Sequence, residues 1–392
     1  GSSIDYIRQF VLDVQTIFVV KSIINDALLH KNLAACTKKH YNRTMINILE
    51  ERDIRFKKFT ALALAVVTAA SVAMTGCGSR IDEDAVVATL GDKEISLGLA
   101  NFMAQYTAVS YDSYITMGYA KENMWSQDLS GNGKTMQDNV KDGILTQIQT
   151  DYLLEDHMKD YGVEITDEEL SDIDTAAQQF MDDNSKEAIR TMGAKKEYVA
   201  EMLRLNLIQK KMYNAIIATV DTEVSDEEAA QRTFSYIKVS TEAHYDDSKN
   251  YVEYTDDEKA ELEKTAEKIA EEAKTDFDAA ATDNGYTVST YSYGSDEIGE
   301  DGTATGSMDA SIITAADALK EGEVSSMISV DGKGYYVIRL DSEFDRDATD
   351  KEKETIVSQR QSDKYTEVCD SYKEEKEWTV NDDVWAAVSF DM

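Results

Sequence analysis

The stretch MDASIITAADALKEGEVS, Met308–Ser325, decides the fold of the second half of this 392-residue chain. Its apolar and small residues predict a short helix that ends at Leu319, and Glu321-Gly322 predicts a turn. A strand is expected next, at 335–340, because Tyr, Val, Ile and Leu cluster there. The stretch therefore predicts the helix, turn and closing strand of a module that mixes helices with a sheet.

The residues before this stretch complete the module. Strands are expected at 234–240 and 288–293, and a charged helix is expected to start at the capping box Thr255-Asp256-Asp257-Glu258. A shorter helix is expected at 277–282, and another capping box at Ser225 opens the module. This order of strands and helices predicts an α+β domain over 225–345.

The preceding residues, 85–224, predict a helical domain. After a hairpin at 85–96, helices are expected from Ser96, from Thr135 to Gly162, from the capping box at Thr166, and over 195–219. Apolar residues recur on these helices at helical spacing. Such stripes indicate either plain core or an apolar binding surface, and the candidate contact residues are Met103, Tyr106, Met202 and Met212.

Residues 346–392 predict a C-terminal helix, over 350–376, and a strand at 378–380. We expect this tail to pack on the helical domain.

A different segment, Arg55–Cys77, reads RFKKFTALALAVVTAASVAMTGC. A basic start, a short apolar run and a small-residue cleavage site predict a secretory signal at 55–76. The ending Thr75-Gly76-Cys77 resembles a bacterial lipobox, which implies a lipid on Cys77 and a tether over 77–84. An uncleaved helix is the alternative. Residues 1–54 are treated as an upstream extension without an assigned domain.

The chain carries 76 acidic and 40 basic side chains, a net charge of −36. Such a surface repels phosphate backbones, so nucleic acid is not an expected partner. The three cysteines include Cys77, so no thiol metal cluster or cofactor site is expected. The chain has no proline, and we have no physical account of that.

The stretch Met308–Ser325 resembles the parvulin (PpiC-type) family of peptidyl-prolyl isomerases, as do Asp276-Phe277-Asp278-Ala279 and the closing strand Gly334–Leu340. With the helical domain and the returning tail, residues 85–392 resemble PrsA- or SurA-type foldases. The resemblance implies a SurA-N-like helical chaperone domain plus a parvulin-like α+β domain.

Family catalysis places two histidines behind the amide and holds proline in an apolar pocket. At the matching positions this chain has Tyr236 and Tyr336 in place of histidine, while Met308 is kept and Ile312 replaces an aromatic residue. Asp317 falls at another apolar position. A phenol is a different hydrogen-bonding partner from an imidazole, so weak or absent isomerisation is expected. His157 and His244 lie in no matching motif.

The function that these observations predict is a membrane-anchored, extracytoplasmic chaperone for unfolded secreted polypeptides. An active isomerase is one alternative, and a solute-binding lipoprotein, which needs a parallel sheet, is another. Two acidic segments are candidate calcium sites: 341–352, which has Arg346 where the turn needs glycine, and the loop with Asp296, Glu300 and Asp301. Neither is favoured, and no metal site is expected.

Overall fold

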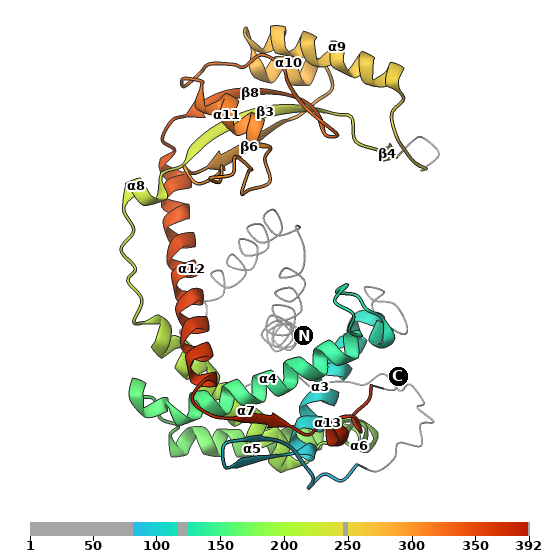
Figure 1. The fold of residues 1–392 in the computed structure, drawn as a ribbon, viewed down its shortest axis with the longest axis vertical. Helices are drawn as coiled ribbons and strands as arrows, with labels where there is room; N and C mark the ends of the chain where they lie inside the picture. Colours follow the sequence, from blue (N-terminus) through green and yellow to red (C-terminus); the bar gives the residue numbers. More distant parts are fainter. Residues whose placement is uncertain (1–80, 117–123, 246–249, 391–392) are drawn as a thin grey trace. The chain divides into compact units, whose positions relative to one another are not determined.

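The structure, a computed structural model, describes residues 81–116, 124–245 and 250–390. The extension 1–54, the signal segment 55–76 and the lipidation candidate Cys77 lie outside the described residues. Contacts divide the chain into two compact units. Within the described residues, unit one comprises 81–220 and 361–390, and unit two comprises 221–360. Figure 1 shows the elements of each unit, and their mixture of helices and antiparallel sheets is the predicted α+β class.

Unit one contains a small antiparallel sheet in the order β2-β1-β9. Its strands are β1 (Val86–Leu90), β2 (Lys93–Ser96) and β9 (Trp378–Val380). The tail therefore returns to the start of the unit, where Leu90 pairs with Trp378. It is held there by a buried lysine, because Lys141 Nζ donates hydrogen bonds to the carbonyl oxygens of Trp385 (2.9 Å) and Val388 (2.7 Å).

Helices make up most of unit one. They are α3 (Leu97–Thr116), η2 (Met124–Ser126), α4 (Met136–Asp156), η3 (Met158–Tyr161), α5 (Asp167–Asp183), α6 (Lys186–Met192), α7 (Lys196–Ile217) and α13 (Asp382–Trp385).

The helix start predicted at Thr135 and the capping box predicted at Thr166 are confirmed, and the structure shows a capping box at Thr135 as well. Each threonine side chain accepts from the backbone N–H three residues later, so α4 and α5 begin where the sequence places them. The predicted end of α4 was wrong, since the α-helix stops at Asp156. Gly162 instead ends the short 3-10 helix η3, at a positive φ of 63°.

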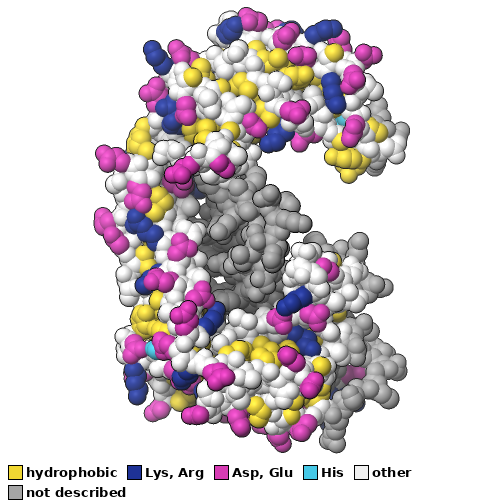
Figure 2. All heavy atoms as spheres, in the orientation of Figure 1, with side chains coloured by type: hydrophobic (Ala, Val, Ile, Leu, Met, Phe, Trp, Pro, Cys, Tyr) yellow, Lys and Arg dark blue, Asp and Glu magenta, His cyan; other side chains and the backbone are white. Residues whose placement is uncertain are grey.

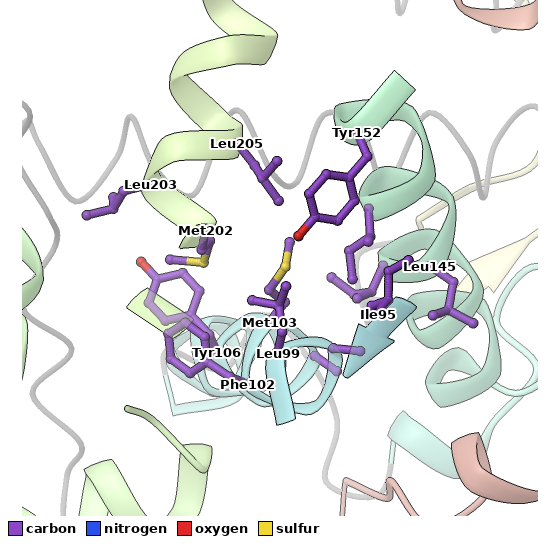
Figure 3. Close-up of a cluster of buried hydrophobic side chains, with 14 of the residues drawn as sticks. Ile95, Leu99, Phe102, Met103, Tyr106, Leu145, Tyr152, Met202, Leu203 and Leu205 are labelled. Atoms are coloured by element: carbon purple, nitrogen blue, oxygen red, sulfur yellow. The ribbon is translucent and has the colours of Figure 1, made fainter. Parts of the chain in front are cut away.

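A continuous apolar core joins the elements of unit one. Figure 3 shows part of it, with side chains from α3, α4 and α7 pointing toward one another. Phe102 and Tyr106 pack against Phe180 of α5, with ring centroids 6.1 Å apart in both pairs.

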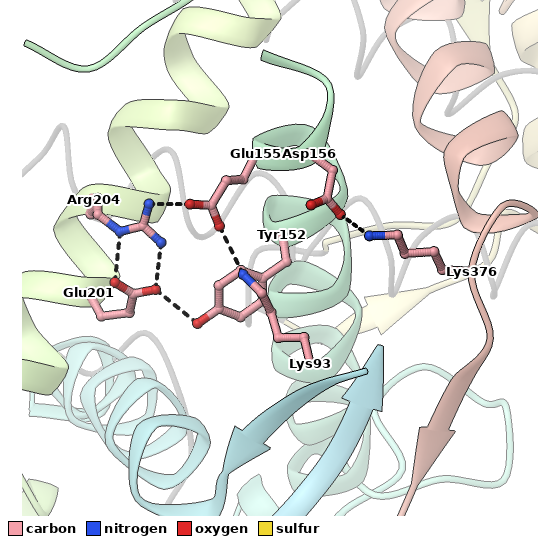
Figure 4. A network of polar contacts seen from close by, with 7 residues as sticks. All are labelled: Lys93, Tyr152, Glu155, Asp156, Glu201, Arg204 and Lys376. Carbon is pink, nitrogen blue, oxygen red and sulfur yellow. Dashed lines mark hydrogen bonds and ion pairs between the residues drawn. The ribbon is translucent and has the colours of Figure 1, made fainter. Parts of the chain in front are cut away.

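A half-buried polar network joins α4, α7 and β2 beside this core (Figure 4). The Arg204 guanidinium donates two 2.8 Å hydrogen bonds to Glu201 and one of 2.5 Å to Glu155. Lys93 Nζ donates to the other Glu155 oxygen at 3.1 Å and lies 3.8 Å from the ring centroid of Tyr152. Tyr152 in turn donates its hydroxyl to Glu201 at 2.9 Å.

Unit two is built on a four-stranded antiparallel sheet in the order β6-β3-β8-β7. Its elements are α8 (Asp226–Ala229), β3 (Arg232–Ser240), β4 (His244–Tyr245), β5 (Tyr251–Val252), α9 (Asp256–Ala273), α10 (Phe277–Asp283), β6 (Val288–Tyr293), α11 (Ala310–Asp317), β7 (Ile328–Val330) and β8 (Gly334–Ser342).

The two faces of this sheet carry separate cores because side chains alternate along a strand. On one face Phe234, Ile338 and Leu340 pack with α11. On the other, Ile237 and Val337 pack with α9 and α10. The four-stranded sheet is thus covered by helices on both sides.

The helix α12 (Arg346–Lys373) begins in unit two, and its residues from 361 onward belong to unit one. It starts four residues before the predicted position because Asp345 accepts a hydrogen bond from the backbone N–H of Ala348 and so caps it. The helix predicted from Ser225 is a single turn, α8. Asp226 of that turn forms ion pairs with Arg346 (2.8 Å) and Lys353 (2.5 Å) of α12.

Acidic side chains outnumber basic ones on the face that Figure 2 displays. This agrees with the net charge of −36. Hydrophobic side chains are scattered between the charges.

Candidate peptide-binding site

Tyr236 and Tyr336 stand on the neighbouring central strands β3 and β8. The strand register places Tyr236 opposite Ile338 and Lys238 opposite Tyr336, so the two tyrosines are diagonal neighbours on the face that α11 covers. Their ring centroids are 6.1 Å apart and their planes are tilted by 39°. Tyr336 is buried, with 5% of its surface exposed, whereas Tyr236 is half-buried.

The other two predicted site residues come from the segment around α11. Ile312 lies in the first turn of the helix and is fully buried, and Met308 immediately precedes the N-cap Asp309. Met308, Ile312 and Tyr336 belong to one apolar cluster, and Tyr236 packs against it. The structure therefore brings all four predicted residues together.

Lys238 sets the electrostatic environment of Tyr336. Burial raises the pKa of Tyr336, and the nearby Lys238 ammonium only partly offsets this. Lys238 Nζ lies 5.8 Å from the Tyr336 ring centroid and also pairs with Glu242. At neutral pH the phenol therefore stays protonated, so it can donate or accept a hydrogen bond but can act neither as a base nor as a cation.

A hydrogen-bonded pair on the same face of the sheet, Tyr291 with Glu297, was not predicted from the sequence. Tyr291 donates its hydroxyl to the buried carboxylate of Glu297, and burial together with this bond raises the pKa of Tyr291 to about 12. A Cβ on Gly306 would come within 1.9 Å of the Glu297 carboxylate, so glycine is required where the loop before Met308 passes the Tyr291–Glu297 hydrogen bond. The pair anchors the loop that leads into Met308. Strand alternation at 288–293 was the available signal, because it places Tyr291 and Tyr293 on one face.

Asp317, expected at an apolar position of the site, has a different role. It accepts a 2.8 Å hydrogen bond from the hydroxyl of Tyr293 and lies 3.6 Å from Arg232. Arg232 also donates to the carbonyl oxygens of Ala316 and Leu319, at the C-terminal end of α11. The half-exposed Asp317 thus fixes the end of the helix and does not line an apolar pocket.

In both candidate calcium segments, acidic side chains accept hydrogen bonds from neighbouring protein groups. Asp341 accepts hydrogen bonds from Ser235 (2.5 Å) and Arg339 (2.7 Å), and α12 begins inside the supposed loop. Asp301 accepts from Thr303. Within the described residues, no three His, Cys, Asp or Glu side chains are arranged to hold a metal ion.

The two described histidines, which lie in no motif of the family, make their contacts with residues other than the candidate site residues. His157 contacts Asp160 (2.7 Å) and Glu375 (2.9 Å) and stacks on Tyr372, all in unit one. His244 lies on β4 and stacks on Tyr254.

The four candidate client contacts of unit one are core residues. Met103, Tyr106, Met202 and Met212 are at most 2% exposed. Figure 3 shows the first three pointing into the packed interior. A helical stripe marks the buried side of a helix, and here neighbouring helices cover that side completely. In this conformation the four are therefore unavailable to a client, which corrects the expectation of an open cradle built from them.

No helix in the described part of the chain is both long and apolar enough to cross a membrane.

Taken together, unit two is an α+β domain whose site consists of tyrosines and aliphatic side chains beside α11. Residues 224–352 match the family model of the PPIC-type PPIASE domain.

Several solved structures match part of the chain at low sequence identity. The foldase protein PrsA from Lactococcus lactis is 15% identical, with 78% of this chain and 97% of that chain covered and a TM-score of 0.31. PrsA from Bacillus subtilis is 20% identical, with 68% and 98% covered and a TM-score of 0.20. A structure from a study of two SurA-like chaperones of Campylobacter jejuni, PEB4 and Cj1289, is 14% identical, with 76% and 99% covered and a TM-score of 0.26. No curated protein matches the chain.

Proposed function

We propose that the protein is a foldase of the chaperone type, which binds unfolded secreted polypeptides and holds an extended segment at the site of its PPIC-type domain. The observation that carries the proposal is the domain match over 224–352, with Tyr236 and Tyr336 at the positions that the family resemblance assigns to histidine. The binding surface would be centred on the half-buried Tyr236, which packs against Met308 and Tyr336, while the fully buried Ile312 would support this surface from within the core.

The chemistry of these side chains favours binding over catalysis. Rotation about a prolyl amide has a barrier near 20 kcal/mol, and lowering it requires hydrogen bonds that favour the twisted amide. A protonated, buried Tyr336 beside Lys238 offers one phenol, and its pKa is raised, which makes it a weaker donor than an imidazolium. We therefore infer that isomerisation is slow or absent.

We also infer that the mature protein works outside the cytoplasm, attached to the cell membrane by a lipid on Cys77. The support is the sequence of the segment Arg55–Cys77, with its basic start, short apolar run and terminal Gly-Cys. The acidic surface would keep complexes with clients soluble.

An active prolyl isomerase is the second candidate function. The half-buried Tyr236 packs against the apolar cluster that contains Met308 and Tyr336, and an apolar face of this kind is what a proline ring needs. The solute-binding alternative finds no such support, because every described strand pair in the sheets is antiparallel.

Isomerisation of a short Xaa-Pro peptide by the full chain separates the first two candidates. We expect no acceleration above the uncatalysed rate from the natural protein. A Tyr236→His/Tyr336→His double variant, checked for folding by circular dichroism, is measured in parallel to test whether the altered pair limits the reaction. If the natural protein and the double variant both catalyse isomerisation well above background and at the same rate, the active isomerase becomes the better supported of the two functions.

Client binding is measured separately, as the suppression of aggregation of a chemically unfolded protein diluted into buffer. We expect suppression at a stoichiometric ratio. A folded protein that leaves aggregation unchanged at this ratio contradicts the chaperone proposal.

A further inference from the structure

Unit two carries an exposed aromatic surface outside the site described above. It lies on the ribbon of β4 and β5, where Tyr245 is 72% exposed and Tyr251 is 67% exposed. Among the large hydrophobic side chains that the structure describes, these two are the most exposed. The other exposed ones, which are scattered singly, are Leu129, Leu170, Tyr213 and Phe344. A paired exposure of this kind marks an interaction surface more often than a lone exposed residue does.

The two rings form one patch. Tyr245 and Tyr251 are directly paired across the ribbon, and their ring centroids lie 5.2 Å apart at an interplanar angle of 57°. At the base of the ribbon, His244 stacks on Tyr254 with centroids 4.0 Å apart. In Figure 1 the ribbon continues beyond the end of β3, and Figure 2 shows hydrophobic side chains in this region.

The surroundings of the patch are acidic. Glu253, Asp256 and Asp257 follow β5 directly and are exposed. None of the three forms an ion pair with another residue in the described part of unit two. An exposed tyrosine face attracts a cation, and uncompensated carboxylates nearby add to that attraction.

We propose that the β4–β5 ribbon is a second polypeptide-docking surface, specific for extended segments in which Lys or Arg alternates with apolar residues. The tyrosine rings would cover the apolar side chains and the faces of the cations, while Glu253, Asp256 and Asp257 would attract the charges. Each strand of a two-stranded ribbon also has one free edge, which an extended segment can pair with.

A second copy of this chain is a poorer occupant. With a net charge of −36, two copies repel each other, and the acidic flank of the ribbon would face another acidic surface. The same argument disfavours acidic segments of clients. The inference rests on the proposed chaperone function and specifies which client segments the protein selects.

The test uses the full chain and two fluorescent 14-residue peptides without proline, one alternating Lys with Leu and Phe, the other with Glu in place of Lys. Fluorescence anisotropy gives Kd at low and moderate salt. We expect the cationic peptide to bind at least tenfold more tightly than the anionic one, and salt to weaken its binding.

A Tyr245→Ser/Tyr251→Ser variant is expected to bind the cationic peptide about tenfold more weakly, because two exposed rings are removed. Phe344→Ser, which removes another exposed aromatic of unit two, serves as the matched control and should leave Kd unchanged. A Glu253→Gln/Asp256→Asn/Asp257→Asn variant should keep the rings but lose most of the salt dependence.

Equal Kd values for the natural protein and the double tyrosine variant overturn the docking surface, and so do equal Kd values for the two peptides. The aggregation assay distinguishes this failure from that of the proposed function. If only the docking surface is wrong, the natural protein and the tyrosine variant suppress aggregation equally. If the chaperone function is wrong, neither of them suppresses it.

Discussion

Asp151 lies on α4 inside the core of unit one and is completely buried. Neither of its carboxylate oxygens has a hydrogen-bond partner among the described residues. Burial raises its pKa well above the ordinary value, and nearby Gln147 offsets this only in part. Burial, with a small contribution from Asp151, raises the pKa of Cys369 of α12 to about 11. The core is therefore compatible with a neutral acid and not with a carboxylate.

This environment predicts a pH dependence of stability. Since the pKa is higher in the folded state than in the unfolded chain, the folded state binds the proton more tightly. Stability is then greatest below the ordinary pKa of aspartate and falls as pH rises toward the folded-state pKa. Asp151→Asn removes the cost of burying an ionised carboxylate. We therefore expect the free energy of unfolding of unit one to rise by about 1–3 kcal/mol at pH 7.5 and to change little at pH 4.

Urea unfolding at both pH values measures this effect. Asp172→Asn on α5, an exposed aspartate, serves as the control and should change stability little at either pH. Equal stabilities of the Asp151 variant and the natural protein at pH 7.5 would show that the carboxylate is solvated or paired.

At the level of elements, the network of Figure 4 ties α4 to α7. Burial acts to raise the pKa of Glu155 and Glu201. The hydrogen bonds and charge of Arg204, together with Lys93 at Glu155 and Tyr152 at Glu201, outweigh it, so both pKa values lie below the ordinary value. The side chain of Arg204 is 23% exposed and those of the two glutamates are 26% and 27% exposed, so solvent screens the charges only in part.

Arg204→Met would leave two half-buried carboxylates facing each other without their shared cation. We expect a loss of about 2–3 kcal/mol in the free energy of unfolding, below the range for fully buried pairs. Adding Glu155→Gln to this variant should restore part of the loss, because it removes one of the two charges.

Lys376→Met provides a contrast. It breaks the 2.6 Å pair with Asp156, in which the lysine side chain is 42% exposed, and should cost less than about 1 kcal/mol. Equal losses for the Arg204 and Lys376 variants in urea unfolding would mean that the central network contributes no more than a surface pair.

Local signals in the sequence located most elements correctly. The helix starts at Thr166 and Thr255 follow from capping boxes, which act within four residues. The start at Thr135 follows from the loop of glycine and asparagine before it, and the structure contains all three starts. Short elements were missed, among them α6 and the ribbon of β4 and β5, because one or two turns or a pair of residues leave no measurable periodicity.

The site was predictable only where strand alternation and the family resemblance agreed. Tyr236 and Tyr336 lie on predicted strands and meet as expected. Asp317 was misassigned because its partners Tyr293 and Arg232 come from other strands, and spacing along the chain does not reveal them. Likewise the apolar stripes that contain Met103 on α3 and Met202 on α7 do not indicate whether neighbouring helices cover them or leave them open to a client.

At the scale of the whole molecule, the chain forms two units with separate cores, and unit one is assembled from distant segments. Thr89 pairs with Thr379, although the whole of unit two lies between these two residues in the sequence. No local pattern in either strand indicates which strand it pairs with. Alternation predicts that a strand exists, whereas its neighbour is fixed by tertiary packing.

Separate cores predict two thermal unfolding transitions, each with its own sensitivity to mutation. Ile148→Ala empties a fully buried position in unit one, and Ile338→Ala does the same in unit two. Each should cost about 2–5 kcal/mol, because it removes buried methyl groups and leaves a cavity. Each variant should lower the transition temperature of the unit that carries it by on the order of 5–15 °C and should change that of the other unit much less. Differential scanning calorimetry on the full chain, with both single variants, measures the shifts. A single transition that both variants lower equally would mean that α12, whose residues belong to both units, makes them unfold as one.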